Sequence, residues 1–83
     1  MNPSAAARVV RALGRIEEGN MSNVRGVGGG VFEYRIHFGP GYRLYFGKDG
    51  ADVIILLAGG TKKRQQADIQ AAQNMWKFYK AQE

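Results

Sequence analysis

Two short stretches of alternating apolar and polar residues, separated by Gly39-Pro40-Gly41, constrain the fold more than any other feature of the sequence. They cover residues 31–38 and residues 42–47. Alternation with a period of two is typical of a β-strand that buries one face, and adjacent glycine and proline are typical of a turn. The two stretches therefore predict an antiparallel hairpin.

A third strand is predicted at residues 53–58, where every residue is apolar. Asp49-Gly50 lies shortly before it, and Asp-Gly is favoured in tight hairpin turns. Because the stretch is apolar on both faces, we expect a central or covered strand. With the hairpin, it completes a three-stranded antiparallel meander.

A helix is predicted on each side of these strands. Residues 3–18 carry Val9, Leu13 and Ile16 at helical spacing, and a second helix is expected over residues 61–80. An apolar face with this spacing packs against a sheet. The apolar residues of the second helix that share a face are Ile69, Ala72, Trp76 and Tyr79.

Residues 21–30, between the first helix and the strands, are predicted to form a loop because glycine is frequent there. A glycine-rich loop can bind phosphate, but a P-loop requires Gly-Lys-Ser/Thr next, and no such sequence follows. A flexible connection is the favoured interpretation.

The chain of 83 residues is long enough for one small domain and too short for two. We therefore expect residues 1–83 to form a single α+β domain, a three-stranded antiparallel meander flanked by an N-terminal and a C-terminal helix. Both helices are expected to pack on the apolar face of the sheet. That face is formed by Tyr34, Ile36, Leu44 and Phe46.

The chain carries twelve Lys and Arg against seven Asp and Glu, a net charge of +5. This excess favours a polyanionic partner, although a solubilising surface gives the same balance. The absence of cysteine and the single histidine exclude a Cys/His zinc site and a Cys–His nucleophile. No apolar run approaches the length of a membrane span and no signal peptide is recognisable, so a cytoplasmic protein without membrane contact is expected.

Arg8, Arg11 and Arg15 align on one face of the first predicted helix. Such a stripe is able to contact nucleic acid. Arginines on an exposed helix face are more often only solvated, however, and the solvated interpretation is favoured.

The alternation also places cationic and aromatic side chains together on the polar face of the hairpin. They are Arg35, His37, Arg43 and Tyr45. Lys62 and Lys63 follow the third strand and are expected to overhang this face. Cations suit phosphates, flat side chains suit stacked bases, and histidine exchanges protons readily, so the face is typical of an RNA-binding surface. The alternative is an ordinary solvated face, which any one-sided antiparallel sheet requires.

Three segments carry a more specific pattern. They are residues 32–46, with the Gly-Pro-Gly-Tyr-Arg turn, residues 57–62, which contain Gly-Gly-Thr-Lys, and residues 68–69, Asp-Ile. Together they resemble the addiction-module killer proteins of the RelE/ParE toxin superfamily, and most closely its phage-derived, HigB-like branch. The resemblance covers about residues 8–79.

The resemblance implies a type II toxin that cleaves mRNA on the ribosome, needs no metal or cofactor and is held inactive by a cognate antitoxin. Matched by position, Arg43 is implied to stabilise the scissile phosphate, with His37 and Lys62 as further catalytic residues. RNA contacts are expected for Arg35, Tyr45, Lys63 and Asp68. Asp68 also lies near the position where other members place a catalytic group of the last helix.

Two other functions stay open: a ParE-like inhibitor of DNA gyrase, and a truncated, inactive relative that keeps only antitoxin binding. Clustered cations at Arg35, His37 and Arg43 favour the nuclease, because a gyrase inhibitor needs no phosphate-stabilising cluster. The resemblance begins after the strand and helix that open the family's usual domain. An exposed sheet edge is therefore expected, and with it a homodimer. In this dimer either two sheets join through that edge or the first helix of one chain packs on the other.

Overall fold

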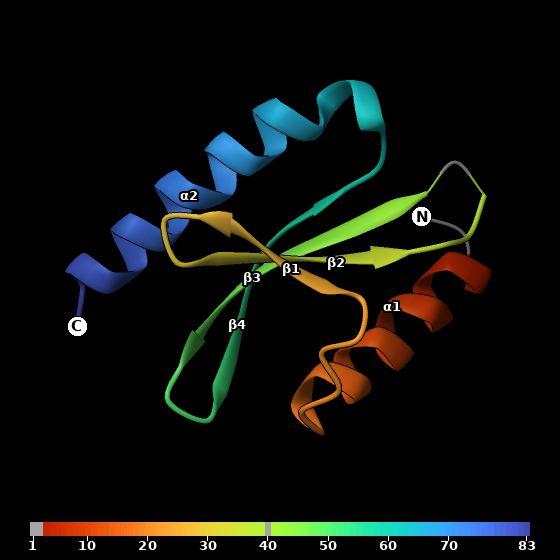
Figure 1. The fold of residues 1–83 in the computed structure, drawn as a ribbon, viewed down its shortest axis with the longest axis horizontal. Coiled ribbons are helices and arrows are strands. Elements are labelled where there is room, and N and C mark those ends of the chain that lie inside the picture. The colour runs from red at the N-terminus through yellow and green to blue at the C-terminus, as the bar shows by residue number, and fades with distance from the viewer. Residues whose placement is uncertain (1–2, 40) are drawn as a thin grey trace.

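The computed structural model describes residues 3–39 and 41–83. Figure 1 shows one sheet with a helix on either side of it. The elements are α1 (Pro3–Glu17), β1 (Val24–Gly28), β2 (Val31–Ile36), β3 (Tyr42–Asp49), β4 (Asp52–Gly59), the short 3-10 helix η1 (Lys62–Arg64) and α2 (Gln65–Ala81). The sheet is antiparallel throughout, in the order β1-β2-β3-β4. The α+β class is confirmed, with one strand more than the sequence predicted.

β1 lies within the segment that was predicted to be a loop. It pairs with β2 and places Val24 opposite Tyr34. Gly29 and Gly30 then reverse the chain with φ angles of 62° and 81°, which glycine adopts without strain. The loop prediction was wrong here because pairing with β2 stabilises a strand that its glycine-rich sequence does not favour by itself.

The turn between β2 and β3 agrees with the prediction from Gly39-Pro40-Gly41. The Gly41 amide donates a hydrogen bond of 3.0 Å to the Phe38 carbonyl. Gly39 and Gly41 both have positive φ angles. Pro40 itself lies outside the described residues.

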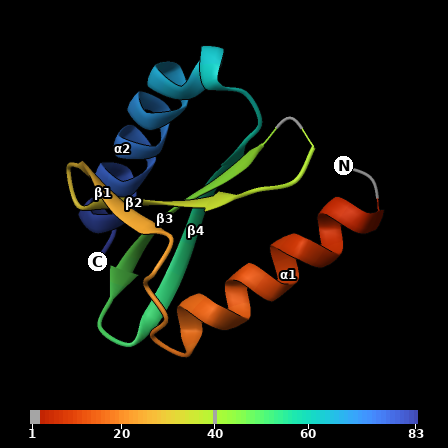
Figure 2. The same cartoon turned by 45° about the vertical axis from the view of Figure 1, so that its right-hand side comes forward.

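The two helices cover opposite faces of the sheet (Figures 1 and 2). α1 packs its Ile16 on the face that carries Tyr34 and Leu44. α2 packs on the other face, where Trp76 meets Tyr45. The prediction that both helices share one face is therefore wrong for α2. Neither helix in the described part of the chain is long and apolar enough to cross a membrane.

The expectation of a central or covered strand at residues 53–58 is met by cover: β4 lies at an edge of the sheet and has a core cluster on each face. Its Val53 packs on the core beneath α1. Ile54 and Leu56 pack on the core beneath α2. Partial burial beneath the two helices explains why this strand is apolar on both faces.

Candidate functional site

Arg35 and Arg43 lie directly opposite each other in the β2–β3 pair. Opposed residues of an antiparallel pair project from the same face, so the predicted placement of these two arginines together is confirmed. His37 follows Arg35 by two residues, just beyond the end of β2. All three side chains line one hollow beside the β2–β3 turn.

Arg43 contributes to this hollow from a buried position, with 9% of its side chain exposed. Its Nε lies 3.9 Å from a carboxylate oxygen of Glu33, which is too far for a hydrogen bond. Among the described residues, Arg43 Nε and Nη1 have no hydrogen-bond acceptor. A buried donor without an acceptor costs about 1–3 kcal/mol. Because Nε and Nη1 are shielded from solvent, it is the exposed part of the Arg43 side chain, beside Arg35, that offers positive charge to an anion in the hollow.

A buried carboxylate, Glu33, lies behind Arg43 on the same face of the sheet. It accepts hydrogen bonds from Arg25 Nε at 2.9 Å, Gln65 Nε2 at 3.0 Å and the Tyr45 hydroxyl at 2.9 Å. Burial alone raises the pKa of Glu33, but these hydrogen bonds outweigh burial and the pKa is lowered. Glu33 therefore stays ionised and holds a negative charge beneath the hollow.

Tyr45, which was expected to contact RNA, is completely buried. Its ring lies in the core beneath α2. Burial and the hydrogen bond to Glu33 raise the pKa of the Tyr45 hydroxyl, so it remains a neutral donor. Tyr45 therefore has no exposed surface with which to contact RNA, because α2 covers the face of the sheet that was expected to be open.

Asp68, also expected to contact RNA, lies near the start of α2 and is 9% exposed. A Cβ atom at Gly59 would be 2.5 Å from Asp68 Oδ2, so this carboxylate sits over the end of β4. Gly59 is the partner of Arg43 in the β3–β4 pair. Asp68 therefore places a second carboxylate beside the strand of Arg43 and offers little surface for RNA.

Lys62 and Lys63 are exposed in η1, directly after β4. The Thr61 hydroxyl caps this turn by accepting a hydrogen bond from the Arg64 amide. η1 lies at the same end of the sheet as the β2–β3 turn (Figure 1). The two lysines are outside the lining of the Arg43 hollow but near the end of the sheet where it opens.

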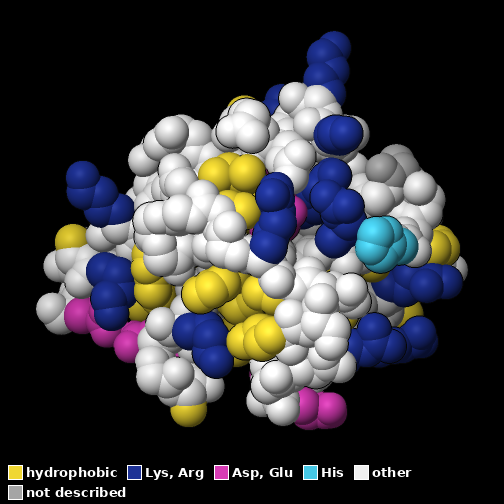
Figure 3. Space-filling view, viewed as in Figure 1, with side chains coloured by type: hydrophobic (Ala, Val, Ile, Leu, Met, Phe, Trp, Pro, Cys, Tyr) yellow, Lys and Arg dark blue, Asp and Glu magenta, His cyan; other side chains and the backbone are white. Residues whose placement is uncertain are grey.

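Basic side chains lie near His37 on the molecular surface. Figure 3 shows Lys and Arg side chains on both sides of the single histidine, His37. Sequence reasoning found Arg35, His37 and Arg43 but missed the network centred on Glu33. The sequence does contain a signal for this network. Glu33 and Arg35 are two residues apart in one strand, so alternation places the Glu33 carboxylate on the face that carries Tyr45.

Fold and site together define a small α+β domain with a cationic hollow at one end of its sheet. Within residues 3–39 and 41–83, no group of three His, Asp or Glu side chains is placed to hold a metal ion.

A family model described as phage-derived protein Gp49-like (DUF891) matches residues 1–79. An uncharacterized protein of Haemophilus influenzae is 38% identical over 71 residues, which is 86% of this chain and 72% of that protein. No solved structure matches the chain. The chain belongs to the Gp49-like family, an addiction-module toxin family related to RelE and HigB. The resemblance found in the sequence is thereby confirmed.

Proposed function

We propose that this protein is the toxin of a type II toxin–antitoxin module and that it cleaves mRNA on the ribosome in the cytoplasm. Its family supports the role of toxin. The observation that carries the nuclease activity is the hollow beside the β2–β3 turn, which Arg43 lines together with Arg35 and His37.

The reaction proposed for this hollow is transfer of the scissile phosphate to the neighbouring 2′-hydroxyl of the RNA. The 2′-oxygen attacks phosphorus, the bond to the 5′-oxygen breaks, and the products are a 2′,3′-cyclic phosphate and a 5′-hydroxyl. Arg43 stabilises the negative charge that develops on the phosphate oxygens, and Arg35 holds the phosphate in place.

His37 is the proton-transfer group in this proposal. Histidine is the residue type that most readily takes up and releases a proton near neutral pH. Lys62 supplies a further cation from η1, and Lys63 contacts the RNA backbone. Tyr45 takes no direct part, because it is completely buried beneath α2. Asp68 takes no direct part, because it lies over the end of β4 and outside the lining of the hollow. The reaction requires no metal ion or cofactor, because the cations of the protein balance the charge of the phosphate.

The natural inhibitor in this proposal is an antitoxin protein, as membership of an addiction-module family implies. Its binding is expected to block access to the hollow. A toxin of this kind needs no membrane partner.

Expression of the protein in a bacterial host, followed by mapping of the 5′ ends of mRNA, tests the proposal. New ends phased with codons are expected, and their loss in an Arg43→Gln variant assigns the cuts to this hollow. A Lys77→Gln variant is the matched control, because Lys77 is an exposed cation of α2. Defects in DNA supercoiling without new mRNA ends would instead identify a gyrase inhibitor. Normal growth and intact mRNA would identify an inactive relative.

A further inference from the structure

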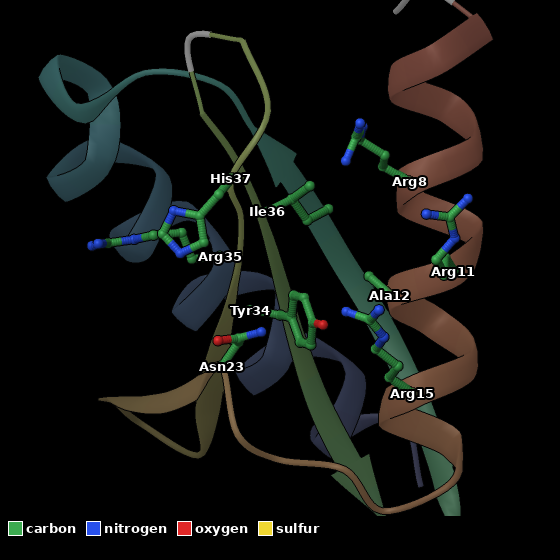
Figure 4. Close-up of a pocket in the computed structure, with 9 residues that line it drawn as sticks. All are labelled: Arg8, Arg11, Ala12, Arg15, Asn23, Tyr34, Arg35, Ile36 and His37. Carbon is green, nitrogen blue, oxygen red and sulfur yellow. The ribbon is translucent and has the colours of Figure 1, made fainter.

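A groove of about 180 Å³ lies between α1 and the end of β2 (Figure 4). Arg8, Arg11 and Arg15 of α1 line one wall. Arg35 and His37 line the groove from β2 and its extension. The arginine stripe on the first helix therefore faces a defined cavity, whereas the sequence alone favoured an ordinary solvated face.

The arginines of this groove lack carboxylate partners. Within the described residues, Arg8, Arg11, Arg15 and Arg35 take part in none of the ion pairs. Arg8 lies over the Phe38 ring instead, at 4.3 Å from the ring centroid. Cations gathered without carboxylates repel one another, so an anion that binds among them relieves an unfavourable charge cluster.

Tyr34 shows the effect of this charge on the wall of the groove. Burial alone raises the pKa of its hydroxyl, but hydrogen bonding with Arg15 and Asn23 and the charge of Arg15 lower it overall. Figure 4 shows Arg15 and Asn23 on either side of the Tyr34 ring. The groove therefore favours a negatively charged oxygen at this position.

The groove and the Arg43 hollow are neighbours. Arg35, Ile36 and His37 line both of them. Along α1, the seven residues from Arg8 to Arg15 correspond to a rise of about 10 Å, which leaves room for more than one phosphate group. The surface that runs from α1 past His37 to Arg43 is therefore continuous.

We propose that this groove binds the sugar–phosphate backbone of single-stranded RNA, through Arg11 and Arg15, and guides it into the Arg43 hollow. This inference rests on the proposed function, because it describes how the mRNA substrate reaches the Arg43 hollow. Arginine binds phosphate with two parallel hydrogen bonds. Interfaces with nucleic acid are much more positively charged than interfaces between proteins, so RNA fits a groove lined by four arginines better than an acidic protein segment does.

Fluorescence anisotropy with a labelled single-stranded RNA oligonucleotide, at several salt concentrations, tests the proposal. The wild-type protein is compared with an Arg11→Gln/Arg15→Gln variant and with Lys77→Gln as the matched control. Each phosphate contact contributes a slope of about 0.7 to the dependence of log K on log salt for single strands. The double variant is expected to bind about 20-fold more weakly at about 0.1 M salt, with a slope shallower by about 1.4. Lys77→Gln is expected to leave both unchanged.

The arginines that are changed are exposed and glutamine is a good helix former, so the double variant is expected to fold. Equal RNA binding by wild type and double variant overturns the proposal. So does unchanged RNA binding combined with loss of binding to a polyglutamate peptide, which would assign the groove to an acidic protein. If the double variant loses RNA binding, the claim that the groove binds RNA is supported, even if the wild type cuts no mRNA. If the wild type cuts mRNA and the double variant binds RNA as tightly as the wild type, the role of the groove is refuted while the proposed nuclease function stands.

Discussion

The Tyr45 hydroxyl donates a hydrogen bond of 2.9 Å to the Glu33 carboxylate in the layer between the sheet and α2. The two residues are direct partners in the β2–β3 pair. Arg25 and Gln65 donate to the same carboxylate, so β1, β2, β3 and α2 meet at one group. This polar cluster holds α2 against the sheet.

The first prediction concerns the contribution of Glu33 to stability. In a Glu33→Gln variant a neutral amide replaces the charged acceptor of three hydrogen bonds, so the free energy of unfolding is expected to fall by about 1.5–3 kcal/mol. Unfolding in urea measures this free energy for the wild type and the variant. Glu17→Gln, an exposed change on α1, is the control and is expected to have an effect within about 0.5 kcal/mol. Equal effects of the two changes would contradict the role of the cluster.

The second prediction concerns pH. The pKa of Glu33 is lowered from its ordinary value of 4.5, so the folded state binds this proton less tightly than the unfolded state. The stability that Glu33 supplies is therefore complete above about pH 4.5 and is lost as the pH falls through the lowered pKa. The difference in unfolding free energy between wild type and Glu33→Gln is expected to shrink in that range. A constant difference from neutral pH down to about pH 3 would refute this.

The third prediction compares two glycines. A Cβ atom at Gly47 would overlap the Trp76 ring, so Gly47→Ala is expected to destabilise the protein by about 1–3 kcal/mol. A Cβ atom at Gly14, in α1, would meet no other side chain within 4 Å, so Gly14→Ala is expected to stabilise the protein by about 0.5–1 kcal/mol. Thermal unfolding measures both. A Gly47→Ala variant that unfolds at the same temperature as the wild type would contradict the packing of Trp76 of α2 against the sheet.

The fourth prediction concerns the edge of the sheet. β4 is an edge strand of eight residues, and its Ile55 is 43% exposed. A long apolar edge favours pairing with another strand, so we expect a homodimer in which two β4 edges join. Light scattering at micromolar concentration is expected to show a dimer for the wild type and a monomer for Ile55→Lys. A monomeric wild type would exclude this interface.

Much of the fold follows from local patterns in the sequence. Alternation predicted β2 and β3 and placed Arg35 and Arg43 on one face. The register that sets these two arginines opposite each other is visible only in the structure. β1 was missed because its stability comes from pairing with β2, which its glycines do not reveal. The position of α2 was missed because Tyr45 was placed on an open polar face, whereas its hydrogen bond to Glu33 allows it to be buried.

The part of the candidate site that lies on one strand pair was predictable from the sequence, and the part that depends on packing between elements was not. Residues on one strand pair, such as Arg35 and Arg43, are related by local geometry. The burial of Arg43, by contrast, depends on contacts between elements far apart in the sequence. The placement of Arg8, Arg11 and Arg15 beside His37 also depends on how α1 packs on the sheet. No local pattern encodes these relationships.

The fifth prediction tests the central claim, that Arg43 stabilises the phosphate during cleavage of mRNA. The measurement is the rate at which the purified protein cuts mRNA on programmed ribosomes, for wild type, Arg43→Gln and the control Lys77→Gln. Arg43→Gln is expected to lower the rate by a factor of about 10² to 10³ while the protein remains folded, and Lys77→Gln is expected to leave it unchanged. A folded Arg43→Gln variant that cuts as fast as the wild type, or a wild type that makes no cuts, would contradict the account.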